Sequence, residues 1–135
     1  MKYDVVIIGA GPAGIFTALE LVRNGSDKKI LMVEKGKPVD KRHCPKAETG
    51  KCMNCKPNCM ITTGFSGAGA FSDGKLSLSC EVGGELPNLI GSEFAQELID
   101  YTDKIYLEFG ADEHVEGVYE GEEIKEIRKI GRAHV

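Results

Sequence analysis

The sequence has 135 residues, with 17 basic and 21 acidic side chains and a net charge of −4. This length allows a single domain with a modest core. No apolar run approaches the roughly 18 residues that span a bilayer, and an odd count of five cysteines argues against a closed disulfide framework. We therefore expect a cytoplasmic protein with reduced thiols, no membrane span and no nucleic acid partner.

Charge is distributed unevenly along the chain. Residues 1–79 carry 12 basic against 7 acidic side chains, whereas residues 80–135 carry 5 against 14. A basic first half can attract phosphate-bearing ligands. A solvated acidic helical surface in the second half explains the same imbalance equally well.

The first 40 residues predict a βαβ unit. Residues 5–8, VVII, form a β-branched apolar run that is typical of a strand buried on both faces of a parallel sheet. Apolar residues then recur at helical spacing from Ile15 to Val22, and Gly25 stands where such a helix would end. Residues 29–34, KILMVE, predict a second buried strand. The expected fold class is therefore α/β with parallel strands.

The pattern G-x-G-x-x-G follows the first strand. Gly9 lets the chain turn tightly, Gly11 lets a diphosphate approach the backbone, and Gly14 lets the helix pack close to the strand. Free N–H groups at the helix start can bind the phosphate. Glu34, at the end of the second strand, can accept hydrogen bonds from ribose hydroxyls and would repel a 2′-phosphate. We predict a dinucleotide site, and the alternative is a glycine-rich structural turn.

A second glycine-rich stretch, ITTGFSGAGAFSDGKLSLS, covers residues 61–79. Its glycines, Gly64, Gly67, Gly69 and Gly74, alternate with small residues. Such a loop exposes backbone N–H groups with little side-chain bulk, as is needed where the chain runs close to a ligand. It could cover the far side of a flavin or its diphosphate, and the alternative is a flexible loop or hairpin.

Four segments resemble a known family. YDVVIIGAGPAG, EKGKPVDKRHCP, GFSGAGAFSDGKLSLS and IYLEFGA are similar to uncharacterised FAD-dependent dehydrogenases, a group of bacterial and archaeal NAD(P)/FAD-dependent oxidoreductases. The opening GAGPAG also resembles flavoproteins with two dinucleotide domains, which favours FAD over NAD. The resemblance implies that residues 1–128 are an incomplete, N-terminal part of a Rossmann-like FAD/NAD(P)-binding domain with Cys-rich and Gly-rich loops.

The same resemblance implies a function. A flavin would transfer a hydride or electrons to or from a small-molecule substrate that the sequence does not identify, with NAD(P)H as a candidate electron partner. No catalytic residue and no oligomeric state is indicated. The FAD-contacting residues that the resemblance implies are Gly9, Gly11, Pro12, Ala13, Gly14, Glu34, Lys35, Arg42, Gly67, Ala68, Gly69 and Ser72.

Four cysteines, Cys44, Cys52, Cys55 and Cys59, are spaced C-x7-C-x2-C-x3-C. The C-x2-C pair can hold one metal ion and the other two thiols could complete a tetrahedral set, although the whole spacing matches no common zinc or ferredoxin pattern. Neighbouring lysines favour thiolates and hence a redox dithiol, but the C-x4-C pair of pyridine nucleotide–disulfide oxidoreductases is absent. Loop thiols, a metal or iron–sulfur site and a redox dithiol all stay open. The alternative function is accordingly a Cys-rich metal-binding or flavin–disulfide redox module.

The second half predicts one amphipathic helix within residues 91–111. Ser92 is the expected N-cap, Gly110 the expected end, and the expected buried stripe is Phe94, Leu98, Tyr101 and Ile105. The sequence then ends without the further strands that such a flavoprotein needs. IGRAHV resembles a translated DNA-sequencing adapter, and the alternative is a native helix end. We therefore expect residues 129–135 to be a non-native tail, and this piece alone to be inactive.

Overall fold

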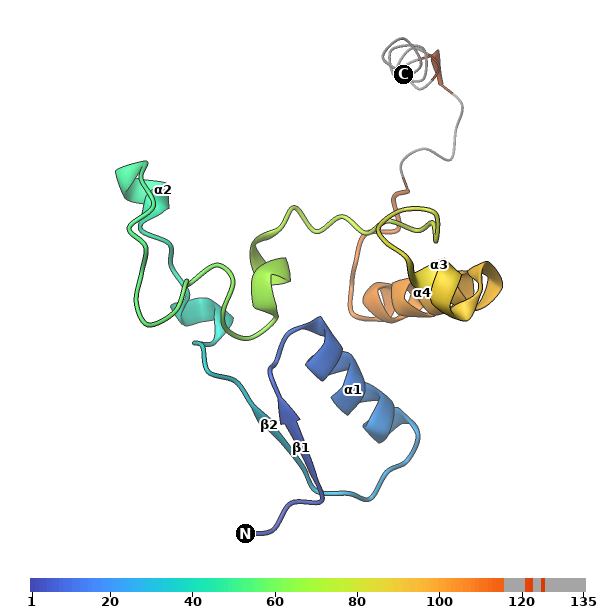
Figure 1. The fold of residues 1–135 in the computed structure, drawn as a ribbon, viewed down its shortest axis with the longest axis horizontal. Helices are drawn as coiled ribbons and strands as arrows, with labels where there is room; N and C mark the ends of the chain where they lie inside the picture. Colours follow the sequence, from blue (N-terminus) through green and yellow to red (C-terminus); the bar gives the residue numbers. More distant parts are fainter. Residues whose placement is uncertain (116–120, 123–124, 126–135) are drawn as a thin grey trace. The chain divides into compact units, whose positions relative to one another are not determined.

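The computed structural model describes residues 1–115, 121–122 and 125, so the predicted tail at 129–135 lies outside the described residues. The chain divides into two compact units, Met1–Lys75 and Leu76–Val135. Figure 1 shows the elements, which in chain order are β1 (Val5–Ile8), α1 (Pro12–Arg23), β2 (Ile30–Val33), the 3-10 helix η1 (Val39–Lys41), α2 (Lys46–Thr49), the 3-10 helix η2 (Gly67–Phe71), α3 (Leu86–Ile90) and α4 (Ser92–Glu108).

The first unit contains the predicted βαβ arrangement. β1 and β2 are parallel neighbours, in a register that pairs Val5 with Ile30 and Ile8 with Val33, and α1 is the connection between them (Figure 1). Pro12 fits the first turn of α1 because it has no N–H to leave unpaired. Gly25 follows the helix with φ of +69°, which lets the chain turn away. The α/β fold class is confirmed, as a partial Rossmann-like unit.

Only one face of β1 is well covered in the described part of the chain. Ile7 is buried, and a Cβ at Gly14 of α1 would lie 3.2 Å from its Cγ2 atom, so Ile7 faces the helix. Alternate residues of a strand point to opposite faces, and Val6 and Ile8 are 54% and 88% exposed. The expectation that this strand is buried on both faces is therefore wrong for this structure, because α1 can cover one face only.

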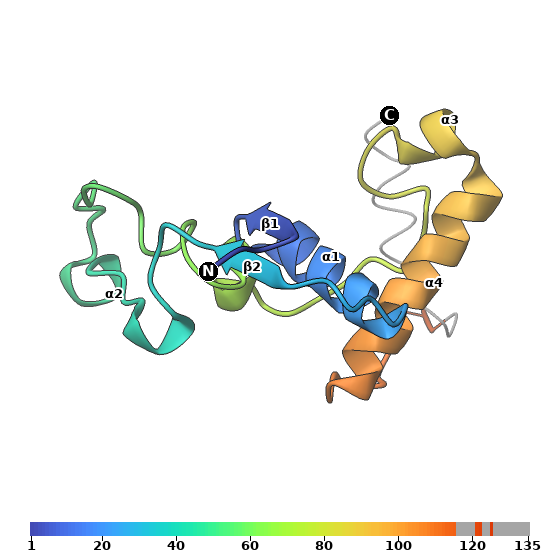
Figure 2. The same cartoon turned by 90° about the horizontal axis from the view of Figure 1, so that it is seen from below.

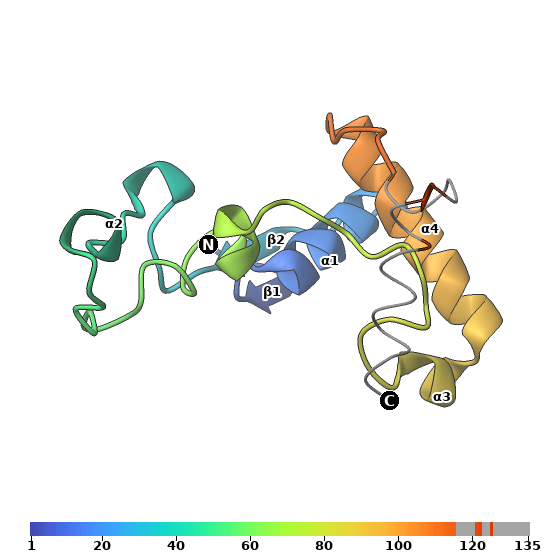
Figure 3. The same ribbon diagram turned by 90° about the horizontal axis from the view of Figure 1, so that it is seen from above.

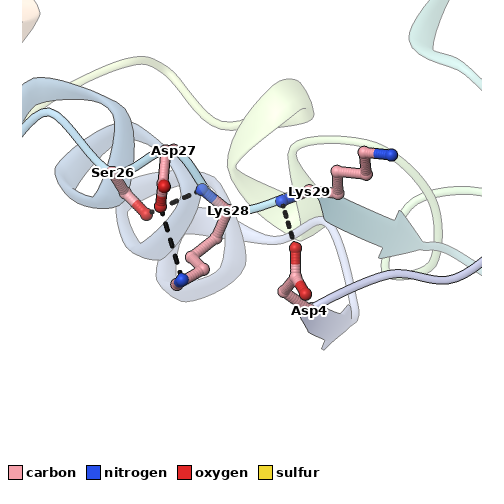
Figure 4. Close-up of polar contacts among 5 residues, drawn as sticks. All are labelled: Asp4, Ser26, Asp27, Lys28 and Lys29. Atoms are coloured by element: carbon pink, nitrogen blue, oxygen red, sulfur yellow. Dashed lines mark hydrogen bonds and ion pairs between the residues drawn. The ribbon is translucent and has the colours of Figure 1, made fainter.

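The Asp4 carboxylate links the amino ends of the two strands by a hydrogen bond. Asp4 accepts a hydrogen bond from the backbone N–H of Lys29 at 2.9 Å, one residue before β2 begins (Figure 4). The same close-up shows Lys28 bonded locally, through its backbone N–H to Ser26 and its ammonium to Asp27. Asp4 thus fixes the start of both strands, at the end opposite to the glycines after β1.

The chain leaves the sheet after β2 and returns to it. Figures 2 and 3 show α2 on a long excursion that extends away from β1 and α1 within the first unit. The excursion closes where Lys37 and Gly64 form a parallel bridge and Phe65 donates its N–H to the Lys37 carbonyl at 3.2 Å. The returning segment then enters η2, close to the turn that joins β1 to α1 (Figure 1).

The second unit packs α3 against α4. α4 begins at Ser92 with Gly91 as its N-cap and no capping side chain, so the predicted N-cap role of Ser92 is wrong by one position. Gly110 follows the helix with φ of +92°, as expected for its end. None of the described helices is long and apolar enough to span a membrane.

The buried face of α4 differs from the predicted stripe. Ala95 and Ile105 are its buried residues, whereas the predicted Phe94, Leu98 and Tyr101 are 52%, 39% and 40% exposed. The prediction therefore holds for Ile105 only. The segment before α3 decides the face, because the Gln96 amide donates to the Leu78 carbonyl at 2.9 Å and accepts the Cys80 N–H at 3.1 Å.

Candidate functional site

The first glycine loop, Gly9–Gly14, connects β1 to α1. Gly9 has φ of +103°, a conformation that other residues rarely adopt, and its N–H bonds to the Val33 carbonyl at 2.7 Å. A Cβ at Gly14 would lie 2.0 Å from the Gly9 carbonyl oxygen. The tight turn at Gly9 and the close helix packing at Gly14 agree with the sequence analysis.

The start of α1 has backbone N–H groups that no described residue accepts. Gly11 is the N-cap residue, no side chain caps the helix, and the first turn has no acidic residue. Pro12 contributes no N–H, and the N–H groups of Ala13 and Gly14 precede the first intrahelical donor, Ile15, which bonds to the Gly11 carbonyl at 3.0 Å. Two backbone donors and the positive end of the helix dipole are therefore directed at the space before α1.

Glu34 holds the first glycine loop to the end of β2. Its Oε2 accepts the Ala10 N–H at 2.9 Å and its Oε1 accepts the Gly36 N–H at 2.8 Å. These hydrogen bonds, that from Ala10 first, lower the pKa of the Glu34 carboxyl below its usual value. Each oxygen keeps a lone pair, so the predicted bonds to ribose hydroxyls stay possible in chemical terms and stay a prediction.

The second glycine segment, Gly64–Gly74, lies against the first glycine loop. The Ser66 N–H bonds to the Ala10 carbonyl at 2.8 Å. A Cβ at Gly67 would lie 3.6 Å from both the Gly11 Cα and the Pro12 Cδ. The structure thus brings together the two glycine-rich regions that the sequence singles out, although 49 residues lie between them in the chain.

The fold explains some of these glycines and leaves others unexplained. Gly64 is required by packing, because its Cβ would lie 2.5 Å from the Lys37 carbonyl oxygen and 2.7 Å from the Arg42 Cδ. Gly67 and Gly74 have φ of +60° and +76°. Gly11 and Gly69 have neither a positive φ nor any atom within 4 Å of a built Cβ. Neither backbone strain nor crowding by the described residues accounts for the glycine at these two positions.

Arg42 is buried, with 5% of its surface exposed, and bonds to backbone carbonyls. Its Nε donates to Met60 at 2.8 Å, its Nη1 to Phe65 at 2.6 Å, and its Nη2 to Gly67 at 2.8 Å and also to Ile61. Four of its five N–H donors are thereby used. The sequence gives no signal for this role, because every residue offers a carbonyl acceptor.

The remaining predicted cofactor residues lie around the two glycine regions. Lys35 and Ala68 are exposed. The Ser72 hydroxyl donates to the Gly69 carbonyl at 2.9 Å and accepts the Gly74 N–H at 3.2 Å, so it stabilises the end of η2. Their contacts to FAD stay predictions.

The cysteines are not brought together as a metal centre would need. In the described part of the chain no three His, Cys, Asp or Glu side chains could hold one metal ion, so the geometry does not support the metal hypothesis. Cys52 and Cys59 are exposed, and Cys44 and Cys55 are half-buried.

Cys59 has a distinct environment among the thiols. The backbone N–H groups of Thr62 and Ile61 and the Thr62 hydroxyl, in that order of importance, lower the pKa of the Cys59 thiol, and the positive charge of Arg42 adds to them. A thiolate at Cys59 is therefore stabilised by donors that follow it directly in the chain.

Residues 3–58 match the family model of pyridine nucleotide-disulphide oxidoreductases. The matched segment contains β1, the first glycine loop, α1, β2 and Arg42. Pyridine nucleotide-disulphide oxidoreductases bind FAD and NAD(P). The match agrees with the dinucleotide-binding and oxidoreductase character that the sequence resemblance implies, and it ends before the second glycine segment.

A curated relative is similar over a longer stretch. An uncharacterized protein of Clostridium beijerinckii is 44% identical over 77 residues, which is 57% of this chain but 14% of the relative. The chain thus spans about one seventh of the length of that relative. No solved structure matches the chain.

Proposed function

We propose that residues 1–128 are the N-terminal part of the FAD-binding domain of a flavin-dependent oxidoreductase. The observation that carries this proposal is the open start of α1, where no atom of the described residues lies within 4 Å of a Cβ built at Gly11 and none of their side chains caps the helix. A ligand that lies against the backbone accounts for it, because a diphosphate bound at a helix start leaves no room for a Cβ. Gly69, on the neighbouring glycine segment, has the same property.

The residues present fit the dinucleotide part of FAD. The Ala13 and Gly14 N–H groups at the start of α1 would bind the diphosphate, since nothing in the described part of the chain caps them. Glu34 would accept a ribose hydroxyl with its remaining lone pairs. The surface that faces the bound dinucleotide would be lined by Pro12, Ala68 and Gly69, with Lys35 and Ser72 at its edge.

Bound flavin would supply the capacity to transfer a hydride or electrons. The role of this chain would be to bind and orient the cofactor, and no acid or base is assigned to it. The substrate would be a small molecule, NAD(P)H is a candidate electron partner, and a cytoplasmic location is part of the proposal.

Cys59 favours a second candidate, a flavin–disulfide redox module. Its thiol has a lowered pKa, and the thiolate is the form that attacks a disulfide. Cys55 is four positions earlier in the chain, a spacing that differs from the C-x4-C pair of known disulfide reductases. This candidate predicts a disulfide between Cys55 and Cys59 that NAD(P)H reduces to the dithiol and that a disulfide substrate forms again, whereas the first candidate does not need one.

Paired variants of the full-length protein test the FAD proposal. Gly11→Val places a side chain where the diphosphate should lie, so bound FAD should be lost, while the melting temperature of the FAD-free protein changes little. Gly121→Val is the matched control, because no atom of the described residues lies within 4 Å of a Cβ built at Gly121 and its φ is not positive, but Gly121 belongs to the second unit. FAD titration with flavin fluorescence should separate the two variants. Equal FAD affinity in both would overturn the proposal.

A further inference from the structure

A buried arginine joins the end of the excursion to the second glycine segment, which is proposed to lie at the cofactor. Arg42 follows η1, and the carbonyl groups to which it donates belong to residues 60–67, the end of the excursion and the start of the second glycine segment. Its guanidinium also lies 4.7 Å from the centre of the Phe71 ring in η2. One side chain therefore contacts the chain before and within the second glycine segment.

The positive charge of Arg42 is balanced by backbone carbonyl groups and an aromatic ring. Among the described residues, Arg42 forms no ion pair with a carboxylate, although it is 5% exposed. Burying a cation is unfavourable unless its donors are satisfied. Four carbonyl dipoles and the face of one aromatic ring satisfy this one.

The positions of the four carbonyl groups require the planar, multi-nitrogen guanidinium of arginine and not only a positive charge. The carbonyls of Met60, Ile61, Phe65 and Gly67 receive bonds from three different nitrogens of one guanidinium. A lysine ammonium has three donors at a single point and cannot reach acceptors arranged in this way. A Cβ at Gly64 would also lie 2.9 Å from the Arg42 Nε, so the absence of a side chain there is part of the same arrangement.

The bonds of Arg42 also hold in place the residues that contact the first glycine loop. Two of the carbonyls bound by Arg42, those of Phe65 and Gly67, flank Ser66, whose N–H bonds to the Ala10 carbonyl at 2.8 Å. Gly67 in turn lies against Gly11, with 3.6 Å between its built Cβ and the Gly11 Cα. Fixing these two carbonyls fixes the distance between the two glycine regions.

We propose that Arg42 is a positioning residue that holds the second glycine segment against the first glycine loop and so preorganises the cofactor site without touching the cofactor. This inference rests on the proposed function for its effect on FAD, whereas its effect on the loop contact does not. It differs from the contact to FAD that the sequence resemblance implies, because four of the five N–H donors of Arg42 are already bonded to carbonyl groups of the chain.

The experiment uses five variants of the full-length protein: Arg42→Lys, Arg42→Ala, Phe71→Leu, Lys41→Ala and Asp4→Asn. Hydrogen exchange of the Ser66 amide reports the loop contact, and FAD titration reports the site. Arg42→Lys keeps the charge and loses the fork, so Ser66 exchange and the FAD dissociation constant should each rise about tenfold or more, as expected for loss of charged hydrogen bonds. Phe71→Leu, which removes only the ring, should raise both by a smaller factor.

Two variants are controls. Lys41→Ala removes a neighbouring exposed cation and should change both readouts less than twofold. Asp4→Asn weakens the opposite end of the same sheet, so it should lower the melting temperature without changing FAD affinity. An equal loss of affinity in Asp4→Asn would mean that Arg42 acts through general stability, and the positioning role would be wrong.

Other outcomes also decide the question. Normal FAD affinity in Arg42→Lys together with lost affinity in Arg42→Ala would show a direct charge contact and overturn the proposal. Unchanged Ser66 exchange in both Arg42→Lys and Phe71→Leu would also overturn it. If the wild-type protein takes up no FAD, the proposed function fails, and Ser66 exchange alone then decides the role of Arg42.

Discussion

Replacing Gly14 by alanine should destabilise the full-length protein by about 2 kcal/mol, on the scale of core overpacking. The new Cβ would lie 2.0 Å from the Gly9 carbonyl oxygen and 3.2 Å from the Ile7 Cγ2, so the helix must move by about 1 Å to bring even the first distance to 3.0 Å. The Gly9 backbone cannot yield easily, because its N–H is bonded to Val33 at 2.7 Å. Overpacking of this kind costs up to about 3 kcal/mol, and the better helix propensity of alanine returns about 1 kcal/mol.

Gly11→Ala is the internal comparison for this prediction. Its Cβ meets no atom of the described residues within 4 Å and its backbone is extended, so in the FAD-free protein its free energy of unfolding should stay within about 0.5 kcal/mol of the wild type. Urea unfolding followed by far-ultraviolet circular dichroism measures both variants. The packing argument is refuted if Gly14→Ala unfolds at the same urea concentration as Gly11→Ala.

Three further predictions concern the Glu34 carboxyl, the Cys59 thiol and the core of the second unit. The folded-state pKa of Glu34 lies below its usual value of about 4.5, so its stabilising effect is present above that pH and is lost as the pH falls through the lower folded value. The stability difference between wild type and Glu34→Gln should therefore shrink on acidification, and a difference that is constant from pH 7 to pH 3 would contradict this. Cys59 should react with iodoacetamide below its usual pKa of 9.0, and Thr62→Val should shift its rate profile to higher pH, whereas identical profiles would exclude the hydroxyl contribution. Ile105→Ala should cost about 2–4 kcal/mol because Ile105 is 3% exposed, whereas the control Leu89→Ala, at an 80% exposed position, should cost less than about 0.5 kcal/mol.

The βαβ unit could be predicted from the sequence because its signals are local. β1 is a short apolar run, the helix follows from apolar spacing, and Gly14 packs against Gly9 and Ile7, five and seven positions earlier in the chain. The bounds of β1 are those predicted. Residues so close in the chain constrain one another before any tertiary contact forms, so the pattern alone determines the structure.

The arrangement around Arg42 could not be predicted in this way. Its partners are main-chain carbonyls 18 to 25 positions away. Because every residue has a main-chain carbonyl, the sequence cannot indicate which ones bind Arg42. The same is true of Gly64, which looks like a ligand-facing glycine in the sequence and is explained in the structure by the Lys37 backbone and the Arg42 side chain. A glycine-rich segment therefore contains glycines with different causes, and only the structure separates them.

The buried face of α4 shows a third limit. The helix itself follows from its sequence, but apolar residues occupy adjacent faces, at Phe94 and Ala95 and again at Leu98 and Ile99. Which face is buried depends on the segment that packs there, here through the bonds of Gln96 to Leu78 and Cys80. Periodicity alone cannot choose between two faces of similar hydrophobicity.

The most direct test of the central claim is the cofactor content of the full-length protein after incubation with excess FAD and removal of the unbound fraction. We expect an absorption band near ~450 nm and release of about one FAD per chain on denaturation, as one dinucleotide unit predicts. A protein that stays folded, shows no flavin absorption and releases no FAD would contradict the account.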